Sequence, residues 1–586
     1  MMNFKNYPIM TECIIPDKVQ LSNNSFYNAF CNMKNLCYID LNEDKITNIA
    51  YAYNNCTNLT TAVCGNNVTN MTGAYRNCHN LTIAVCGEKV ISMGSAYTNC
   101  KNLTTAVCGN NVTSMAYSYN NCTNLTTAAC GNNVTDMYDA YDECRNLTIA
   151  VCGENVINMS KTYNNCTNLK IAACGDNVKD MSTSYSGCKN LITAVCGNNV
   201  TNMFYSYYNC TNLITAACGD NVTNMAQAYQ YCTNLKIAAC GENVIHMNFT
   251  YQNCTNLITA VCGNNVTNMS GAYQNCTNLI TAACGDNVTS MSSAYNRCYN
   301  LTTAVCGNSV TSMSDAYNNC TSLTTAVCGE KVTSMSGAYR NCHNLTTAVC
   351  GNNVTSMSEA YGYCANLTTA VCGEKVTNMY GAYRYCTNLT TAVCGNNVTD
   401  MSYAYSDCTN LTTAVFGRNV NYISSAYVNC TNIKGDTYLY SNNITETRAC
   451  FGKRNTANRL NIYAHNGSTT LYSLMKYTNH LSLVNTAVTW TDDTTTNGCY
   501  YNATQNIYIY PVSNVMVAYL ENEYDYGVSL LNTTSDYIDA TDNGIAIKTE
   551  YKSQPTEITI DSGTCFAIPV DVSKLENITI EDMEVK

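Results

Sequence analysis

One unit of 22 residues is repeated along most of the chain without insertion or deletion. The copy from Cys254 to Asn275 reads CTNLITAVCGNNVTNMSGAYQN, and its first cysteine recurs every 22 residues from Cys56 to Cys430. A fixed period of this length is typical of solenoids, in which each unit forms one coil stacked on the next. The repeat therefore constrains the fold more than the length of 586 residues does, although that length alone would indicate several domains.

Variation between the copies predicts which side chains are buried. Seven positions hardly vary, and we expect them to form the core of each coil; in this copy they are Leu257, Ala260, Cys262, Val266, Met269, Tyr273 and Cys276. The alternation in LITAVC predicts a short strand, Gly-Asn-Asn predicts a turn, and apolar residues at steps near three predict a short 3₁₀ or α-helical segment. The predicted fold class is a right-handed solenoid, curved because helical segments need more room than strands.

The sequence divides into three parts. Residues 1–35 are expected to cap the first coil, residues 36–433 to form the solenoid, and residues 434–586 to form a β-rich C-terminal domain, either a sandwich or two small modules. Alternating segments in the last part predict strands at 460–463, 487–490, 506–510, 515–520, 545–548, 557–560 and 565–570. Asn-Gly pairs at 466–467, 497–498 and 543–544 predict hairpin turns.

Composition and the first residues limit the expected partners. The formal charge is -11 and only 12% of residues are charged, so neither nucleic acid nor an anionic membrane is an expected partner. No segment approaches the ~18 apolar residues of a membrane-spanning helix, so we expect no membrane insertion. The first twenty residues lack the basic and apolar pattern of a secretory signal, so we expect synthesis in the cytoplasm.

The 40 cysteines have three interpretations. Zinc binding is disfavoured, because the cysteines alternate at spacings of eight and fourteen residues, without a CxxC pair and with only five histidines in the chain. Disulfides are compatible with stacked coils, either across a coil, as between Cys56 and Cys64, or between equivalent cysteines of neighbouring coils. We favour free, buried cysteines that act as small apolar side chains, because Phe416 replaces one of them.

Two rows of equivalent residues, one of asparagines and one of β-branched side chains, also have alternative interpretations. The Asn that precedes the fixed leucine, as at Asn58 and Asn80, is expected to be buried and to bond the backbone of adjacent coils; glycan attachment at Asn-Leu-Thr is the alternative. Outward strand positions such as Thr61 and Val63 form rows of Thr or Ile beside Val or Ala. We interpret these rows as an ordinary β-branched surface or a face covered by a partner, with ice binding as a distant alternative.

The tyrosines fall into two classes. Tyr273 and its equivalents belong to the core column, whereas a second set occupies the variable positions that flank it, which in this copy are Ser270, Gly271, Gln274 and Asn275. Exposed aromatics beside amides suit contact with sugars or proteins, and a solvated face without a partner is the alternative. The candidate ligand contacts are Tyr117, Tyr138, Tyr205, Tyr208, Tyr231, Gln274, Tyr363 and Tyr385.

No nucleophile, carboxylate pair or phosphate-binding loop stands out in the sequence. We therefore expect no enzymatic activity, no metal and no cofactor.

The unit resembles the BspA-like leucine-rich repeats. The pattern V-T-x-M-x-x-A-Y-x-x-C-x-N-L, from Val266 through Tyr273 and Cys276 to Leu279, matches the spacing of aromatic, cysteine and leucine in that family over residues 29–433. The resemblance implies a curved, leucine-rich-repeat-like solenoid used for adhesion to protein or glycan, as in bacterial and protist surface proteins and bacteriophage virions. The chain departs from the family by using Tyr for the usual Phe, and Cys-Gly where many members have an apolar residue and Pro.

The absence of a secretory pattern favours a particle assembled in the cytoplasm. The leading hypothesis is a bacteriophage tail-fibre, tail-tip or head-decorating protein, located in the virion, that contacts a host surface protein or carbohydrate and associates with other virion proteins or with itself. The alternative is a BspA-like adhesin on a bacterial cell surface.

Overall fold

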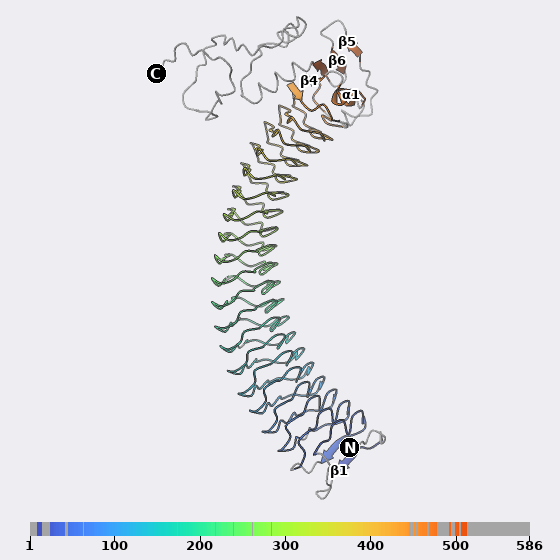
Figure 1. The fold of residues 1–586 in the computed structure, drawn as a ribbon, viewed down its shortest axis with the longest axis vertical. Helices are drawn as coiled ribbons and strands as arrows, with labels where there is room; N and C mark the ends of the chain where they lie inside the picture. The colour runs from blue at the N-terminus through green and yellow to red at the C-terminus, as the bar shows by residue number, and fades with distance from the viewer. Residues whose placement is uncertain are drawn as a thin grey trace, which may run out of the picture.

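The repeats stack into one curved solenoid that runs from the N-terminal end to a small sheet near the C-terminus (Figure 1). The computed structural model describes residues 9–14, 24–40, 45–444 apart from positions 63, 173, 217, 238, 239, 261 and 283, then 447, 449–452, 454–465, 468–476, 491–493, 499–502 and 506–512. Among these residues, no helix is long and apolar enough to cross a bilayer.

The interior of the solenoid consists of columns of identical side chains. In the coil at Cys254, the side chains of Leu257, Val266, Met269, Tyr273 and Cys276 are completely buried. Ala260 is 7% exposed. Cys262 was predicted to be a core residue and is only half-buried, because it lies at the edge of the coil with its thiol directed to the carbonyl of Gly263, 3.6 Å away.

The tyrosine column forms a continuous aromatic stack. Neighbouring rings from Tyr53 to Tyr427 lie nearly parallel, with centroids 5.1–5.5 Å apart. Phe30 extends the stack at one end and Phe451 at the other. Stacked aromatic pairs contribute about 0.5–1.5 kcal/mol each beyond the area they bury, so this column links every coil to its two neighbours.

The short helical segment predicted for each coil is wrong: the segment is a run of turns. In the coil with Met71, the amides of Ala74 and Cys78 bond three residues back, to Met71 and Tyr75. The alternate amides, such as that of Tyr75, instead donate to the next coil, here to the Ala96 carbonyl at 2.8 Å. Turns closing over three residues produce the same apolar spacing as a helix, which explains why the periodicity did not distinguish them.

The predicted strand is also shorter than its sequence pattern. It is reduced to a single parallel bridge in most coils, as between Thr61 and Ile83, and a second bridge row joins Asn70 to Ser92. The second row was not predicted, because Asn and Ser have low strand propensity.

Hydroxyl and thiol groups explain why the columns contain tyrosine and cysteine. The Tyr383 hydroxyl donates to the Val371 carbonyl at 2.5 Å and accepts from the Val371 amide at 2.9 Å, which a phenylalanine could not do. The Cys276 thiol donates to the Tyr251 carbonyl of the preceding coil at 3.0 Å. These cysteines are therefore buried and also hydrogen-bonded between coils.

The glycine after the second cysteine is required by close packing between coils. A Cβ atom added to Gly131 would lie 2.4 Å from the carbonyl oxygen of Gly109 and 3.3 Å from the thiol of Cys108. A side chain at this position would push the coils apart, which accounts for Cys-Gly in nearly every copy.

Short strands cover both ends of the solenoid. At the start, β1 (Glu12–Ile14) pairs in parallel with β2 (Tyr38–Asp40), which places Cys13 beside the buried Ile39. At the other end, β3 (Gly435–Leu439), β4 (Leu460–His465) and β7 (Ile507–Val512) are parallel, and the Lys434 amide joins them to the last coil through the Thr412 carbonyl.

The sheet at the C-terminal end is mixed. Its order is β3-β4-β7-β6-β5, with β5 (Thr491–Asp493) and β6 (Cys499–Asn502) antiparallel, and α1 (Thr469–Lys476) contacts β4. β4 and β7 correspond to the strands predicted at 460–463 and 506–510. The other predicted strands and the three Asn-Gly turns lie outside the described residues.

Candidate binding surfaces

The variable positions form what we call the turn face: positions 72, 73, 76 and 77 of the coil at Met71 and their equivalents, on either side of the buried Ala74 and Tyr75. Two residues of each turn segment have positive φ, here Gly73 at 59° and Asn77 at 62°. Glycine and asparagine tolerate this conformation, whereas bulky residues in it are rare and cluster at functional sites. The chain nevertheless places Tyr205, Tyr363 and Tyr385 there, with φ between 57° and 65°.

The predicted contact tyrosines form three separate groups on the turn face. Tyr117 packs edge-on against Tyr138, with ring centroids 5.2 Å apart. Tyr208 lies between Tyr205 and Tyr231, at 4.9 and 5.5 Å. Tyr363 stacks on Tyr385 at 4.6 Å.

Gln274 lies apart from the tyrosines. It ends a row of amides in which Gln230 donates to Gln252 and Gln252 donates to Gln274. Its carbonyl oxygen is therefore already used within the fold.

The third tyrosine group contains charged partners that the sequence did not indicate. Arg340 lies over the Tyr363 ring, 5.7 Å from its centroid, and pairs with Glu359 at 2.5 Å. Arg384 lies over the rings of Tyr385 and Tyr403, at 5.1 and 5.6 Å. We call these six residues the arginine–tyrosine cluster: Arg340, Glu359, Tyr363, Arg384, Tyr385 and Tyr403. They come from four successive coils and present aromatic faces, guanidinium groups and a carboxylate on one partly exposed surface.

A buried acidic pair lies beside the first tyrosine group. Lys161 contacts Asp139 at 2.8 Å and Asp142 at 3.1 Å, and both carboxylates are less than 10% exposed. Burial raises the pKa of Asp142, while hydrogen bonds from Asn164 and Lys161 oppose the shift. The hydrogen bond with Tyr138 raises the pKa of the Tyr117 hydroxyl. This group is an ion-pair network in which both carboxylates are buried and already paired, while Lys161 is partly exposed.

The strand face is formed by positions 58, 60 and 61 of the coil at Cys56 and their equivalents. The burial of its asparagine row differs from the prediction. The Asn row predicted to be buried is exposed, because its amides bond to one another instead of to the backbone of the coil interior; Asn212 donates to Asn190 at 3.3 Å. Threonine hydroxyls in the adjacent row donate to the preceding coil, as Thr104 does to the Thr82 carbonyl at 3.3 Å. These hydroxyls belong to the row of Thr60 and are committed to the backbone; the ice-binding alternative concerns the neighbouring row of Thr61 and is not tested by them.

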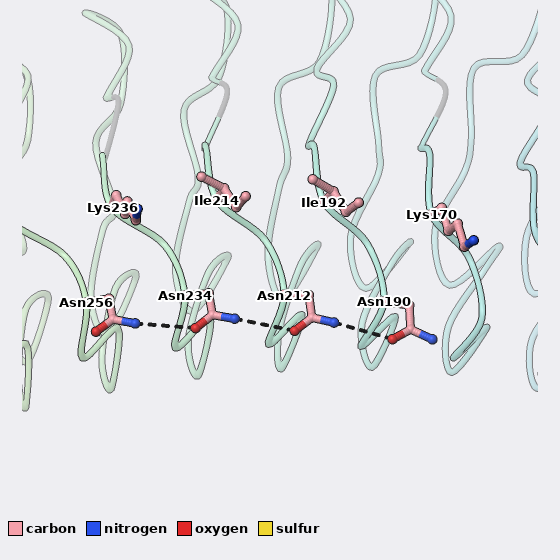
Figure 2. Close-up of a pocket in the computed structure, with 8 residues that line it drawn as sticks. All are labelled: Lys170, Asn190, Ile192, Asn212, Ile214, Asn234, Lys236 and Asn256. Atoms are coloured by element: carbon pink, nitrogen blue, oxygen red, sulfur yellow. Dashed lines mark hydrogen bonds between the residues drawn. The ribbon is translucent and has the colours of Figure 1, made fainter.

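One stretch of the strand face is hollowed and was missed from the sequence. Figure 2 shows the amide row from Asn190 to Asn256 beside a second row in which Ile192 and Ile214 lie between Lys170 and Lys236. The available signal was the replacement of Thr by Ile or Lys at these positions.

In the described part of the chain the cysteines form no metal site, and those of the repeats are buried or half-buried thiols of low reactivity. No group of three His, Cys, Asp or Glu residues there is arranged to hold a metal ion. Burial raises the pKa of the Cys78 thiol well above its usual range, and that of the half-buried Cys130 to about 11. Thiolates, the reactive form, are therefore scarce near neutral pH.

Comparison with known proteins defines the family. The model of the BspA type leucine rich repeat region matches residues 2–126, 93–213, 162–279, 245–368 and 335–458. These segments span most of the chain, which therefore belongs to the BspA-type leucine-rich repeat family, a class of repeat protein generally used for binding or adhesion. No curated protein matches the chain.

Solved structures of bacterial leucine-rich repeat proteins are similar to the solenoid. One from Bacteroides ovatus is 18% identical, with 51% of this chain and 81% of that chain covered and a TM-score of 0.42. A leucine rich cell surface protein from Faecalibacterium prausnitzii is 20% identical, with 42% and 78% covered and a TM-score of 0.30. None of these findings indicates a bacteriophage origin.

Proposed function

We propose that the chain is an adhesive protein that binds a surface protein or glycan through the arginine–tyrosine cluster. The observation that carries this proposal is the presence of Tyr363 and Tyr385 at a position where most coils have asparagine. The exchange costs about 1–3 kcal/mol for a bulky residue with positive φ, and it interrupts the amide row of that column. If these two residues served only the fold, nothing would favour keeping tyrosine in place of asparagine in two successive coils.

The chemistry of the cluster supports recognition of a partner. Tyrosine and arginine are the residues most enriched at binding hot spots, because they combine large contact area with directional hydrogen bonds. Arg340 and Arg384 already lie over tyrosine rings, so their guanidinium groups are positioned before a partner arrives. Less side-chain entropy is then lost on binding.

The test replaces both tyrosines with the common residue, as Tyr363→Asn plus Tyr385→Asn. We expect the variant to be more stable than the native protein and to lose at least tenfold in binding to a glycan array or to intact bacterial and epithelial cells. Periodate or protease treatment of the cells distinguishes glycan from protein. Tyr231→Asn, in the same column but away from the arginines, is the matched control, and equal loss in both variants would contradict the assignment.

Two locations agree with this function. The first is a bacterial cell surface, as for the family generally, and the second is a virion. Protease protection on intact cells tests the first, and mass spectrometry of purified particles tests the second. The binding proposal does not depend on the location: it fails if the double variant binds as the native protein does, or if Tyr231→Asn loses binding equally.

A further inference from the structure

An exposed row of isoleucines runs along the strand face in the middle of the solenoid. In seven successive coils, isoleucine occupies either the position of Thr60 or that of Thr61, and each of these residues is 43–59% exposed. The isoleucines are Ile149, Ile171, Ile192, Ile214, Ile237, Ile258 and Ile280. Coils from residue 298 to residue 413 have threonine at both positions, so the fold does not require isoleucine here.

Scattered exposed apolar residues are ordinary on protein surfaces, whereas contiguous rows mark interaction sites. Four of the isoleucines share the position of Thr60 with two lysines and form a contiguous row: Lys170, Ile192, Ile214, Lys236, Ile258 and Ile280. The backbone joins neighbours in this row, since the Ile214 amide donates to the Ile192 carbonyl and the Lys236 amide donates to the Ile214 carbonyl, both at 3.1 Å. The groove in Figure 2 lies at the centre of this row, with a lysine at each end.

The charge of the groove is positive although the protein is acidic. The segment from Cys56 to Cys64 and its equivalents in the following coils, as far as Phe416, contain no Asp or Glu. In the coils that form the groove, the same segments contain Lys170, Lys189 and Lys236. Neither Lys170 nor Lys236 forms an ion pair with any residue that the structure describes. In a chain of formal charge -11, such a surface complements an anionic partner.

The spacing of the lysines suggests the geometry of that partner. Lys170 and Lys236 are three coils apart, which corresponds to about 14 Å at the usual distance between strands. An extended peptide advances about 3.3 Å per residue and presents alternate side chains to one side, so residues i and i+4 are about 13 Å apart on the same face. The amide row beside the isoleucines supplies hydrogen-bonding groups along the path.

We propose that this groove binds an extended acidic segment of a partner protein, with two carboxylates four residues apart and an apolar residue midway between them. The carboxylates pair with Lys170 and Lys236, and the apolar side chain packs on Ile192 and Ile214. This surface is separate from the arginine–tyrosine cluster, and its occupant is independent of the function proposed for that cluster.

The test uses an array of eleven-residue peptides of the form Glu-x-Φ-x-Glu, where Φ is Ile, Leu, Val or Phe, with Lys-x-Φ-x-Lys peptides and peptides of other spacing beside them. We expect the full-length protein to prefer the Glu peptides with the four-residue spacing, more weakly at high salt. Binding by no Glu peptide above its Lys counterpart would overturn the proposal.

Two double variants restore the residue found in most coils and therefore retain the fold. Lys170→Thr with Lys236→Thr is expected to reduce peptide binding at least tenfold and to abolish its salt dependence, and Ile192→Thr with Ile214→Thr to reduce it about tenfold. Ile83→Thr, an isolated exposed isoleucine, is the control and is expected to have no effect. Unchanged peptide binding in both double variants would refute the site. The proposal would also be refuted if no peptide binds and the protein self-associates in a concentration-dependent way that Ile192→Thr with Ile214→Thr removes, because a second copy of the chain would then be the occupant.

Discussion

The close approach of glycines between coils predicts a large effect for the smallest side chain. In Gly131→Ala the new Cβ lies 2.4 Å from the Gly109 carbonyl oxygen, which is 0.6 Å short of the 3.0 Å that real contacts require. The obstructing atom is backbone, and the Gly109 carbonyl also accepts the Val112 amide at 3.2 Å, so it cannot move without loosening a turn. Such overpacking costs about 1–3 kcal/mol.

Gly94→Ala is the matched control. Its Cβ lies 3.6 Å from the nearest atom, an ordinary contact, and the glycine does not have positive φ. Alanine there is expected to be neutral or to stabilise by about 0.4–1 kcal/mol through the unfolded chain. The two alanine variants should therefore differ by about 1–4 kcal/mol in the free energy of unfolding.

Urea unfolding followed by far-UV circular dichroism measures this difference. The order of the two midpoints is decisive, since unfolding of a solenoid spreads from coil to coil and does not always follow two states. Equal midpoints for Gly131→Ala and Gly94→Ala would refute the view that glycine permits the coil spacing.

Three further predictions concern single groups. Tyr383→Phe should lower the free energy of unfolding by about 1–3 kcal/mol, because the Val371 amide and carbonyl lose their partner; calorimetry should show no such loss for the exposed Tyr422→Phe. Titration with a thiol reagent at pH 8 should modify the exposed Cys37 rapidly and leave Cys78 and its buried equivalents unmodified until denaturant is added. Modification of all the cysteines in the native state would contradict the burial described above. Burial raises the pKa of Asp142 above its unfolded value, so the native state binds the proton more tightly than the unfolded chain does. The stability of the protein relative to Asp142→Asn should therefore fall as pH rises through the acidic range from about 4. Urea midpoints at several pH values check this, and a relative gain in stability on raising the pH would show that pairing with Lys161 outweighs burial.

The sequence was informative wherever repetition exposed what each position tolerates. Invariance of Leu257, Val266 and Tyr273 predicted a core that the structure shows to be completely buried. Copies compared in this way reveal burial but not backbone conformation, so the turns after Met71 were mistaken for a helix. The positive φ at Asn77 was indicated by the asparagine that most copies have there, whereas the position of Gly73 varies too widely between copies to indicate its own.

The binding surfaces were less predictable than the core. The sequence identified Tyr363 and Tyr385 as unusual, but the approach of Arg340 and Arg384 depends on rotamers and on contacts between coils 22 residues apart. Lys170 and Ile214 were overlooked because each looks unremarkable in its own copy. Their meaning appears only when neighbouring coils bring them into one row.

Because every unit has 22 residues, the solenoid can become longer or shorter by whole units during evolution. Deleting one unit between Ile280 and Arg340 rejoins nearly identical surfaces, so the aromatic stack and the hydrogen bonds between coils re-form in register. The only quantity that changes is the distance between the isoleucine groove and the arginine–tyrosine cluster, by about 5 Å per unit. Recombination within such a gene would therefore adjust the reach between two attachment points in fixed steps while leaving each point intact.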